Sequence, residues 1–157
     1  MTTKTNAVRR LERTGVGFSI REYPVDGEHL DAITVARSID AEPDRVFKTL
    51  VARSERGDHL VFCIPGNAEL DLRKAARTAG VRRIALIPLK ELQPLTGYFH
   101  GGCSPIDMKR ALPTWIDESC ELFETIFVSA GVRGMQIEIA PQELCTVVDA
   151  GQADLTA

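Results

Sequence analysis

The chain has 157 residues, of which 44% are hydrophobic and 26% charged, and its formal net charge is −3 at pH 7. These proportions are ordinary for a soluble domain, and no apolar run is long enough to cross a bilayer, so we expect no membrane association. The weakly negative net charge argues against a protein that binds nucleic acid without a partner through a strongly basic face. The length predicts a single domain over 1–157.

The cysteines and histidines do not follow a metal-binding pattern. The four cysteines are far apart and include no Cys-x-x-Cys pair, and the three histidines are scattered. We therefore expect no metal and no cofactor. The N-terminus lacks the apolar core of a signal peptide, and the unpaired thiols suit a reducing environment, so we expect a cytoplasmic location. The residues are Cys63, Cys103, Cys120, Cys145, His29, His59 and His100.

In the first half of the chain, apolar spacing predicts alternating helices and strands. Val8 and Leu11 share one face of a helix that Gly15 ends. A second helix has apolar residues at i, i+3, i+4 and i+7, and strands show alternation. In chain order, we expect a helix over 4–14, a strand over 18–23, a helix over 31–39, and strands over 46–51 and 59–64.

In the second half, cap residues predict the helix ends. Asp71 is the expected N-cap of a helix that ends at Gly80, and Pro141 opens the last helix. The first of these helices is expected to bury Leu72, Ala75, Ala76 and Ala79. Then come a strand over 84–87, a short helix over 88–92, strands over 114–116, 125–128 and 135–139, and a helix over 141–148.

The order of these elements indicates a mixed α/β fold. No repeat, low-complexity segment or linker divides the chain. The last seven residues, 151–157, continue none of the patterns, and we expect them to be frayed.

The predicted strand Val46–Val51 places a lysine on an otherwise apolar face. Val46, Lys48 and Leu50 alternate on that face. A lysine there must reach water, meet an anion or shift its pKa. Lys48 therefore either packs its stem on the sheet with its head in solvent, or binds an anionic group of a substrate.

The segment Gly97–Pro113 has neither a helical nor a strand period for most of its length. It concentrates Gly101, Gly102, Ser104 and Pro105 between two apolar runs. Glycines permit unusual dihedrals and a close approach to a ligand, and proline stiffens the loop. Such a loop can present backbone N–H and C=O groups to a substrate, so we predict a site here. A bulged turn between two strands is the alternative.

Five separate motifs resemble the YbaK/EbsC family. They run in order from about residue 7 to residue 149 without a large insertion. This family belongs to the editing-domain superfamily that includes the insertion domain of bacterial prolyl-tRNA synthetases, and the nearest branch consists of free-standing Cys-tRNA(Pro) deacylases. The motifs are Val46-Phe-Lys48-Thr-Leu50, Leu70-Asp-Leu-Arg-Lys74, Gly101-x-x-x-Pro105, Leu112-Pro-Thr-Trp-Ile-Asp117 and Arg133-Gly-Met-Gln-Ile-Glu-Ile-Ala-Pro141.

The resemblance implies a YbaK-like fold, with a mixed, partly barrel-like β-sheet flanked by helices. It also implies a trans-editing deacylase for mischarged Cys-tRNA(Pro), in which the substrate's own thiol attacks its ester and releases a thiolactone. An aminoacyl ester is already activated, so such an enzyme needs positioning and oxyanion stabilisation more than a strong nucleophile. The catalytic residues would be Lys48, Gly101, Gly102 and Ser104.

Further residues are candidates for binding the substrate. Tyr23 and Asp26 match polar positions that follow the first strand in the family, although Tyr23 can equally pack at the strand end. Cys103 and Pro105 belong to the glycine loop. Asp117 either orients a group in the pocket or caps the following turn.

Three basic residues are candidates for contact with the tRNA. Lys109 and Arg110 adjoin the glycine loop, and Arg133 lies in a glycine-rich turn; solvated surface positions are the alternative for all three. The expected partners are the 3′ end of tRNA(Pro) and prolyl-tRNA synthetase, with no DNA. Weak net attraction would suit a protein that meets tRNA already held by a partner.

Three other functions remain open. A deacylase for Ala- or Ser-charged tRNA could use water, and a non-catalytic module could bind aminoacyl-tRNA or the synthetase. A thiol-dependent hydrolase could use Cys103 as its nucleophile. That thiol would need a base or a lowered pKa, and His100 is near in sequence.

Overall fold

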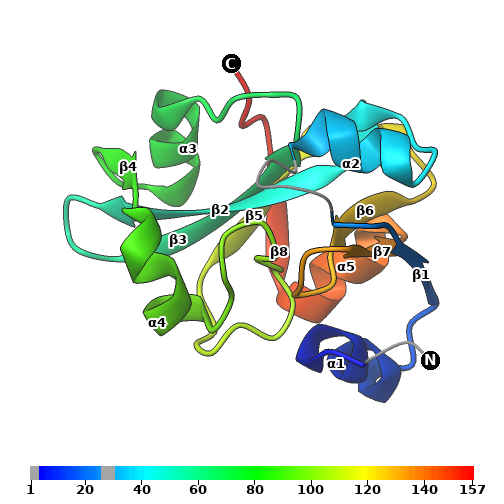
Figure 1. Cartoon of the computed structure of the whole chain (residues 1–157). Helices are drawn as coiled ribbons and strands as arrows, with labels where there is room; N and C mark the ends of the chain where they lie inside the picture. The colour runs from blue at the N-terminus through cyan, green and yellow to red at the C-terminus, as the bar shows by residue number, and fades with distance from the viewer. Residues whose placement is uncertain (1–3, 26–30) are drawn as a thin grey trace.

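The computed structural model describes residues 4–25 and 31–157, and in this part of the chain the predicted helices and strands occur in the expected order, together with further short elements (Figure 1). The helices are α1 (Asn6–Thr14), α2 (Ala32–Ser38), α3 (Leu72–Ala79), α4 (Leu92–Thr96) and α5 (Pro141–Val148). The 3-10 helices are η1 (Pro43–Arg45), η2 (Leu89–Glu91) and η3 (Glu118–Leu122). The strands are β1 (Phe18–Glu22), β2 (Phe47–Ser54), β3 (His59–Pro65), β4 (Ile84–Leu86), β5 (Thr114–Asp117), β6 (Ile126–Ser129), β7 (Met135–Ile139) and β8 (Ala150–Ala153).

The described strands form two sheets. The first is antiparallel, with the order β1-β7-β6. The second is mixed, with the order β4-β2-β3-β5-β8: β2 is antiparallel to β3 and β4, whereas β3, β5 and β8 are parallel. An isolated backbone bridge between Val46 and Phe127 joins the sheets where β2 begins. The mixed α/β class is therefore confirmed, and the described strands form two bridged sheets that do not close into a barrel.

The helix ends confirm the cap predictions. The Asp71 side chain accepts hydrogen bonds from the first turn of α3, and Gly80 ends that helix with φ 73°. Gly15 ends α1 in the same left-handed conformation, with φ 76°. The prediction that Leu72 is buried was wrong, because 43% of this first residue of α3 is exposed and the buried face starts at Ala75.

The prediction of a frayed tail over 151–157 was also wrong. Residues 150–153 form β8, parallel to β5, and Leu155 is fully buried. The Leu155 N–H donates to Asp117 Oδ1 at 2.9 Å, and Lys74 Nζ donates to the Thr156 carbonyl at 2.8 Å. The residues of β8 are mostly small and show no apolar period, so no local pattern predicts a strand there. Pairing with β5 stabilises this strand more than its own side chains do.

The two sheets share a continuous interior. Figure 1 shows β1, β6, β7, α1 and α5 gathered on one side of the molecule, and α3, β4 and α4 on the other. The main core joins apolar residues of α1, β2, β5, β6, β7 and α5, and a second core lies under α3. None of the described helices has both the length and the apolar character that a membrane span requires. The start of β2 lies where the two sheets are joined, and a cavity opens there.

Candidate active site

A cavity of about 320 Å³ lies where β2 begins, between residues of the two sheets. This volume is at the lower end of the range of small-molecule pockets. Strand β2 contributes Lys48 and Thr49, and the ends of β6 and β7 contribute Ser129 and Gln136. The other lining residues are Tyr23, Asp31, Ala32, Val35, Val46, Phe47, Leu50, Gly66, Leu92, His100, Gly101 and Cys103.

Lys48 is a half-buried cation in the wall of this cavity. Burial lowers the pKa of Lys48 from its ordinary value, and the negative charge of Glu69 acts in the opposite direction. Within the described residues, no carboxylate lies within ion-pair distance of the Lys48 ammonium. A bound anion would therefore offset a desolvation that the described residues compensate only in part, through the charge of Glu69.

The glycine loop forms another wall, and its glycines are required by close packing. Gly101 has φ +88°, and a Cβ there would lie 2.5 Å from Arg133 Nε. A Cβ at Gly102 would lie 3.0 Å from Val132 Cα. Arg133 Nε also donates a hydrogen bond to the His100 carbonyl at 3.2 Å. The loop is thus pressed against the turn between β6 and β7.

Helix α2 covers the cavity because Gly66 has no side chain. A Cβ at Gly66 would overlap the Cβ of Ala32 in α2. The Gly66 N–H donates to the Val46 carbonyl at 2.7 Å, which keeps the end of β3 beside the start of β2. Sequence analysis did not single out this glycine, since the contact joins segments that are distant in sequence.

Two loop residues predicted as catalytic lie outside the cavity lining described above. Ser104 is fully buried and its Oγ accepts a hydrogen bond from Ile106 N at 3.2 Å. Gly102 is buried against Val132. Pro105, predicted to bind substrate, lines a second cavity behind the loop, next to Arg110. These residues shape the loop, and Gly101 and Cys103 are the parts of it that reach the cavity.

Cys103 lines the cavity, but its thiol is not activated. Burial raises the pKa of Cys103 to about 12, against a smaller opposing effect of a hydrogen bond with Thr96. The thiolate is the nucleophilic form of cysteine, and at neutral pH it would be rare here. Among residues 4–25 and 31–157, no group of three or more His, Cys, Asp or Glu residues is arranged to hold a metal ion.

Of the remaining residues that were predicted to bind substrate, one lines the cavity and another lies away from it. Tyr23 lines the cavity with a largely buried ring, and its N–H donates to the Gly134 carbonyl at 3.0 Å. Asp26 lies outside the described residues. Asp117 is buried away from the lining: Oδ2 accepts from Ser119 N and Oδ1 from Leu155 N. These contacts match the capping interpretation of Asp117.

Of the three predicted tRNA contacts, only Arg133 lies against a loop that lines the cavity. Its side chain is exposed, and its Nε contacts the glycine loop. Lys109 is also exposed, and its Nζ donates to the Pro94 carbonyl at 3.4 Å. Arg110 lines the second cavity, together with Arg10 and Asp107.

Sequence analysis missed two polar residues on the cavity wall. Gln136 is 6% exposed, and within the described part of the chain its Oε1 has no hydrogen-bond partner. It pairs across the sheet with Ser129, whose Oγ accepts from Gly131 N at 3.1 Å. The alternating pattern of β7 could have identified Gln136 as a candidate, because it places Gln136 and Glu138 on the face opposite the apolar residues of that strand.

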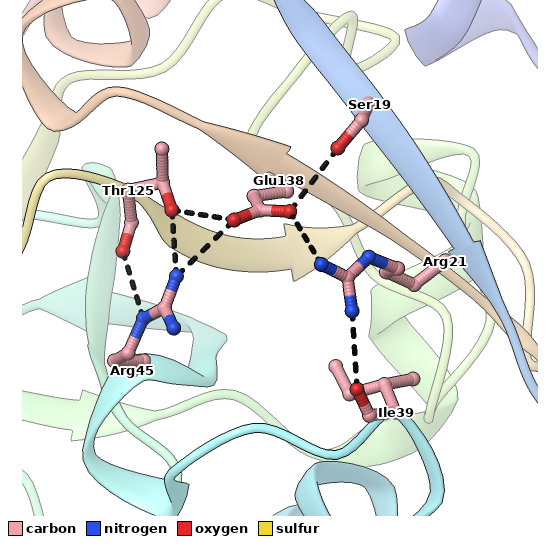
Figure 2. A network of polar contacts seen from close by, with 6 residues as sticks. All are labelled: Ser19, Arg21, Ile39, Arg45, Thr125 and Glu138. Atoms are coloured by element: carbon pink, nitrogen blue, oxygen red, sulfur yellow. Dashed lines mark hydrogen bonds and ion pairs between the residues drawn. The ribbon is translucent and has the colours of Figure 1, made fainter.

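Figure 2 shows Glu138 at the centre of a polar network whose residues lie outside the cavity lining. Glu138 Oε1 accepts hydrogen bonds from Ser19 and Arg21, and Oε2 accepts from Arg45 and Thr125. The bond from Thr125, then those from Ser19 and the arginine charges, hold the pKa of Glu138 below its usual value despite partial burial.

The arginines of this network extend it to the elements around the cavity. Arg45 ends η1 just before β2, and Arg21 also donates to the Ile39 carbonyl at the end of α2. Both guanidinium groups lie over the Phe127 ring, 5.5 Å (Arg21) and 5.0 Å (Arg45) from its centroid. The network therefore fixes α2 and the start of β2 against the β1-β7-β6 sheet.

Sequence comparison places the chain among proteins that act on aminoacyl-tRNA. The model of the aminoacyl-tRNA editing domain matches residues 28–147. A protein of Enterococcus faecalis named "Putative Cys-tRNA(Pro)/Cys-tRNA(Cys) deacylase EbsC" is 42% identical over 153 residues, which cover 98% of this chain and 93% of that protein. A proline–tRNA ligase of Syntrophotalea carbinolica is 26% identical over 107 residues, which cover 62% of this chain and 19% of the ligase.

Structure comparison agrees. A crystal structure of a "putative trans-editing enzyme for prolyl tRNA synthetase" matches with a TM-score of 0.85 and 28% identity, and covers 99% of both chains. The family model and the E. faecalis relative each span most of this chain, and the cavity is built from residues within the resemblance. The chain belongs to the aminoacyl-tRNA editing domain family.

Proposed function

We propose that this chain is a single-domain, cytoplasmic aminoacyl-tRNA deacylase that clears Cys-tRNA(Pro) in trans. The observation that carries the proposal is a cavity lined by both the half-buried Lys48 and Gly101 of the glycine loop, while burial keeps the Cys103 thiol protonated. Such a cavity is suited to position an activated ester that brings its own nucleophile. The similarity to EbsC supports a cysteinyl substrate, and the similarity to the trans-editing structure supports action in trans beside prolyl-tRNA synthetase.

Lys48 and the loop have separate roles in this proposal. The Lys48 ammonium binds the 3′-terminal phosphate or ribose as a point charge. Backbone N–H groups of the loop at Gly101 stabilise negative charge on the ester carbonyl oxygen, because rigid donors cost little reorganisation during the reaction. Ser129 and Gln136 supply further polar groups on the facing wall.

The chemical step needs no nucleophile from the protein. The sulfur of the cysteinyl group attacks its own ester carbonyl, so that a C–S bond forms and the C–O bond to the ribose breaks. The thiol proton goes to the departing ribose oxygen, and the products are a cyclic thiolactone and tRNA with a free hydroxyl. Water later opens the thiolactone to cysteine. A well-placed intramolecular nucleophile can act at an effective concentration of about 10⁵–10⁸ M.

Delivery of the tRNA depends on a partner in this proposal. The net charge of −3 predicts weak binding to free tRNA, because nonspecific affinity comes largely from basic groups that displace counterions. Arg133, Lys109 and Arg110 would add shallow phosphate contacts. We expect prolyl-tRNA synthetase to bring the substrate, so its addition should accelerate deacylation at low enzyme concentration.

A deacylation panel tests the function. The full chain is assayed with tRNA(Pro) charged with Cys, Ala, Ser or Pro, and with Cys-tRNA(Cys). We expect Cys-tRNA(Pro) to be cleared much faster than the Ala or Ser adducts, with thiolactone detected early by mass spectrometry. Alkylation of the substrate thiol should stop turnover without preventing binding.

Two results would contradict the proposal in different ways. Equal rates for the Cys and Ala adducts, or turnover of the alkylated substrate, would indicate a deacylase that uses water. Binding of every charged tRNA without any turnover would indicate a non-catalytic module.

A further inference from the structure

An exposed aromatic residue directly precedes two residues that line the cavity. Phe99 is 71% exposed and directly precedes His100 and Gly101, which both line the cavity. Its carbonyl accepts a hydrogen bond from Gly102 N at 3.0 Å, so Phe99 begins the tight turn that forms this wall. A single exposed apolar residue is common, and it needs a second observation before it indicates an interaction surface.

The neighbouring turn provides that observation. Val132 is 44% exposed, and its backbone lies against Gly102 so closely that a Cβ there would be 3.0 Å away. Arg133, which follows, is exposed and bonded to the loop through Nε. We call Phe99, Val132 and Arg133 the rim. Two exposed apolar residues and an exposed guanidinium are thus carried by two contacting loops, one of which lines the cavity through His100 and Gly101.

The size of the cavity indicates what must lie on the rim. Lys48, Ser129 and Gln136 provide polar groups inside the cavity for an aminoacyl ester and its ribose. A volume of about 320 Å³ leaves little room for more. The base attached to that ribose would then sit at the mouth, where an aromatic ring and a guanidinium are the side chains that bind bases and phosphates.

We propose that the rim binds the 3′-terminal nucleotide of the aminoacylated RNA, with Phe99 stacked on the base and Arg133 contacting the adjoining phosphate. This inference rests on the proposed function, in which the aminoacyl ester occupies the cavity. Stacking is tolerant of base identity, so the rim recognises a nucleotide end and not a tRNA sequence. The contact is made equally in the ground state and the transition state, and it therefore lowers KM and leaves kcat unchanged.

The test compares two short RNAs acylated with cysteine, one ending in adenosine and the other in an abasic ribose. Phe99→Ala should raise KM roughly fivefold to a hundredfold on the adenosine-ended RNA, with unchanged kcat, and should have no effect on the abasic RNA. Phe99→Tyr, which keeps the ring, should behave like the unmodified chain. Leu122→Ala is the matched control, because Leu122 is 79% exposed and does not line the cavity.

A fluorescence measurement adds a readout that does not depend on turnover. With 2-aminopurine in place of the terminal adenine, stacking on Phe99 should quench emission on binding, and Phe99→Ala should abolish the quenching. If the unmodified chain deacylates the adenosine-ended RNA but Phe99→Ala leaves its KM unchanged, or raises KM equally on both RNAs, the rim assignment is overturned while the deacylase stands. If the unmodified chain deacylates neither RNA, the proposed function itself fails.

Discussion

Arg133 and His100 join the two loops that shape the mouth of the cavity. Arg133 Nε donates a hydrogen bond to the His100 carbonyl oxygen at 3.2 Å. The same guanidinium occupies the space beside Gly101, where a Cβ would lie 2.5 Å from Nε. Gly101 also has φ +88°, a conformation that residues with a side chain rarely adopt. The position of this loop therefore depends on the absence of a side chain at one residue.

Gly101→Ala should impair deacylation. The new methyl group must displace Arg133 or move the loop, and the left-handed backbone adds about 1–2 kcal/mol of strain. Gly57→Ala is the matched control: Gly57 has φ +86° with nothing within 4 Å of the added Cβ, so it carries similar strain in open space. Steady-state kinetics and thermal unfolding of both variants separate the effects. Normal kinetics for Gly101→Ala would favour a plain turn.

Lys48→Met should lower kcat/KM by roughly tenfold to a hundredfold, the value of one charge-assisted hydrogen bond. Burial lowers the pKa of Lys48, so its charge is disfavoured in the folded chain without substrate, and its removal should not lower the melting temperature. Lys90→Met, at an exposed position outside the cavity, is the control. A folded Lys48→Met variant with unchanged turnover would remove this lysine from the site.

The pH profile of kcat/KM provides a second test of Lys48. A lysine whose pKa is lowered loses its proton at a lower pH than an ordinary lysine. Activity should therefore fall on the alkaline side as Lys48 becomes neutral, and Lys48→Arg should extend activity to higher pH. A profile that Lys48→Arg does not shift would contradict a role for the ammonium charge.

Gln136→Leu should stabilise the chain in the absence of substrate and reduce its activity. Gln136 Oε1 has no hydrogen-bond partner among the described residues, and a buried acceptor left unpaired costs about 1–3 kcal/mol, which the apolar side chain avoids. Ser119→Ala is a matched control, since Ser119 Oγ is also buried without a partner in the described residues but lies outside the cavity lining. Urea unfolding and deacylation assays should show similar or higher stability for both variants and lost activity for Gln136→Leu alone. Full activity of Gln136→Leu would mean that the amide does not touch the substrate.

Cys103→Ala and Cys103→Ser should keep substantial activity. With its pKa raised to about 12, the Cys103 thiol has almost no thiolate near neutral pH, and iodoacetamide should modify it slowly. The rate of deacylation and the rate of alkylation, followed by mass spectrometry, measure both expectations. Two inactive but folded variants would make the thiol nucleophile the leading hypothesis.

Glu138→Gln should lower the free energy of unfolding by about 1–3 kcal/mol at pH 7, because Arg21 and Arg45 would lose their carboxylate partner. The pKa of Glu138 is depressed in the folded chain, so its contribution is present above the unfolded value of about 4.3 and is lost as pH falls through the folded value. The stability difference between the two proteins should therefore close below that pH. A difference that persists in acid would show that packing, and not charge, is responsible.

Local signals in the sequence predicted most of the elements in their order and singled out Lys48 and the glycine loop, which contribute to the lining of one cavity. The caps at Asp71 and Gly80, the alternation around Lys48 and the glycines before Pro105 depend on neighbours within a few residues, and the structure reproduces the elements that they predicted. These features also carried the resemblance that the family model confirms. They were readable because periodicity, capping and glycine conformation are properties of short segments.

The tertiary structure decided which residues form the cavity wall. Ser129 meets Gln136 only through the pairing of β6 with β7, and Ala32 covers the site only through its contact with Gly66. Likewise, residues 150–153 form a strand because they pair with β5 at the edge of the sheet. No local pattern predicts such contacts, because the stabilising free energy comes from residues that are distant in the chain and meet only after the two sheets have packed.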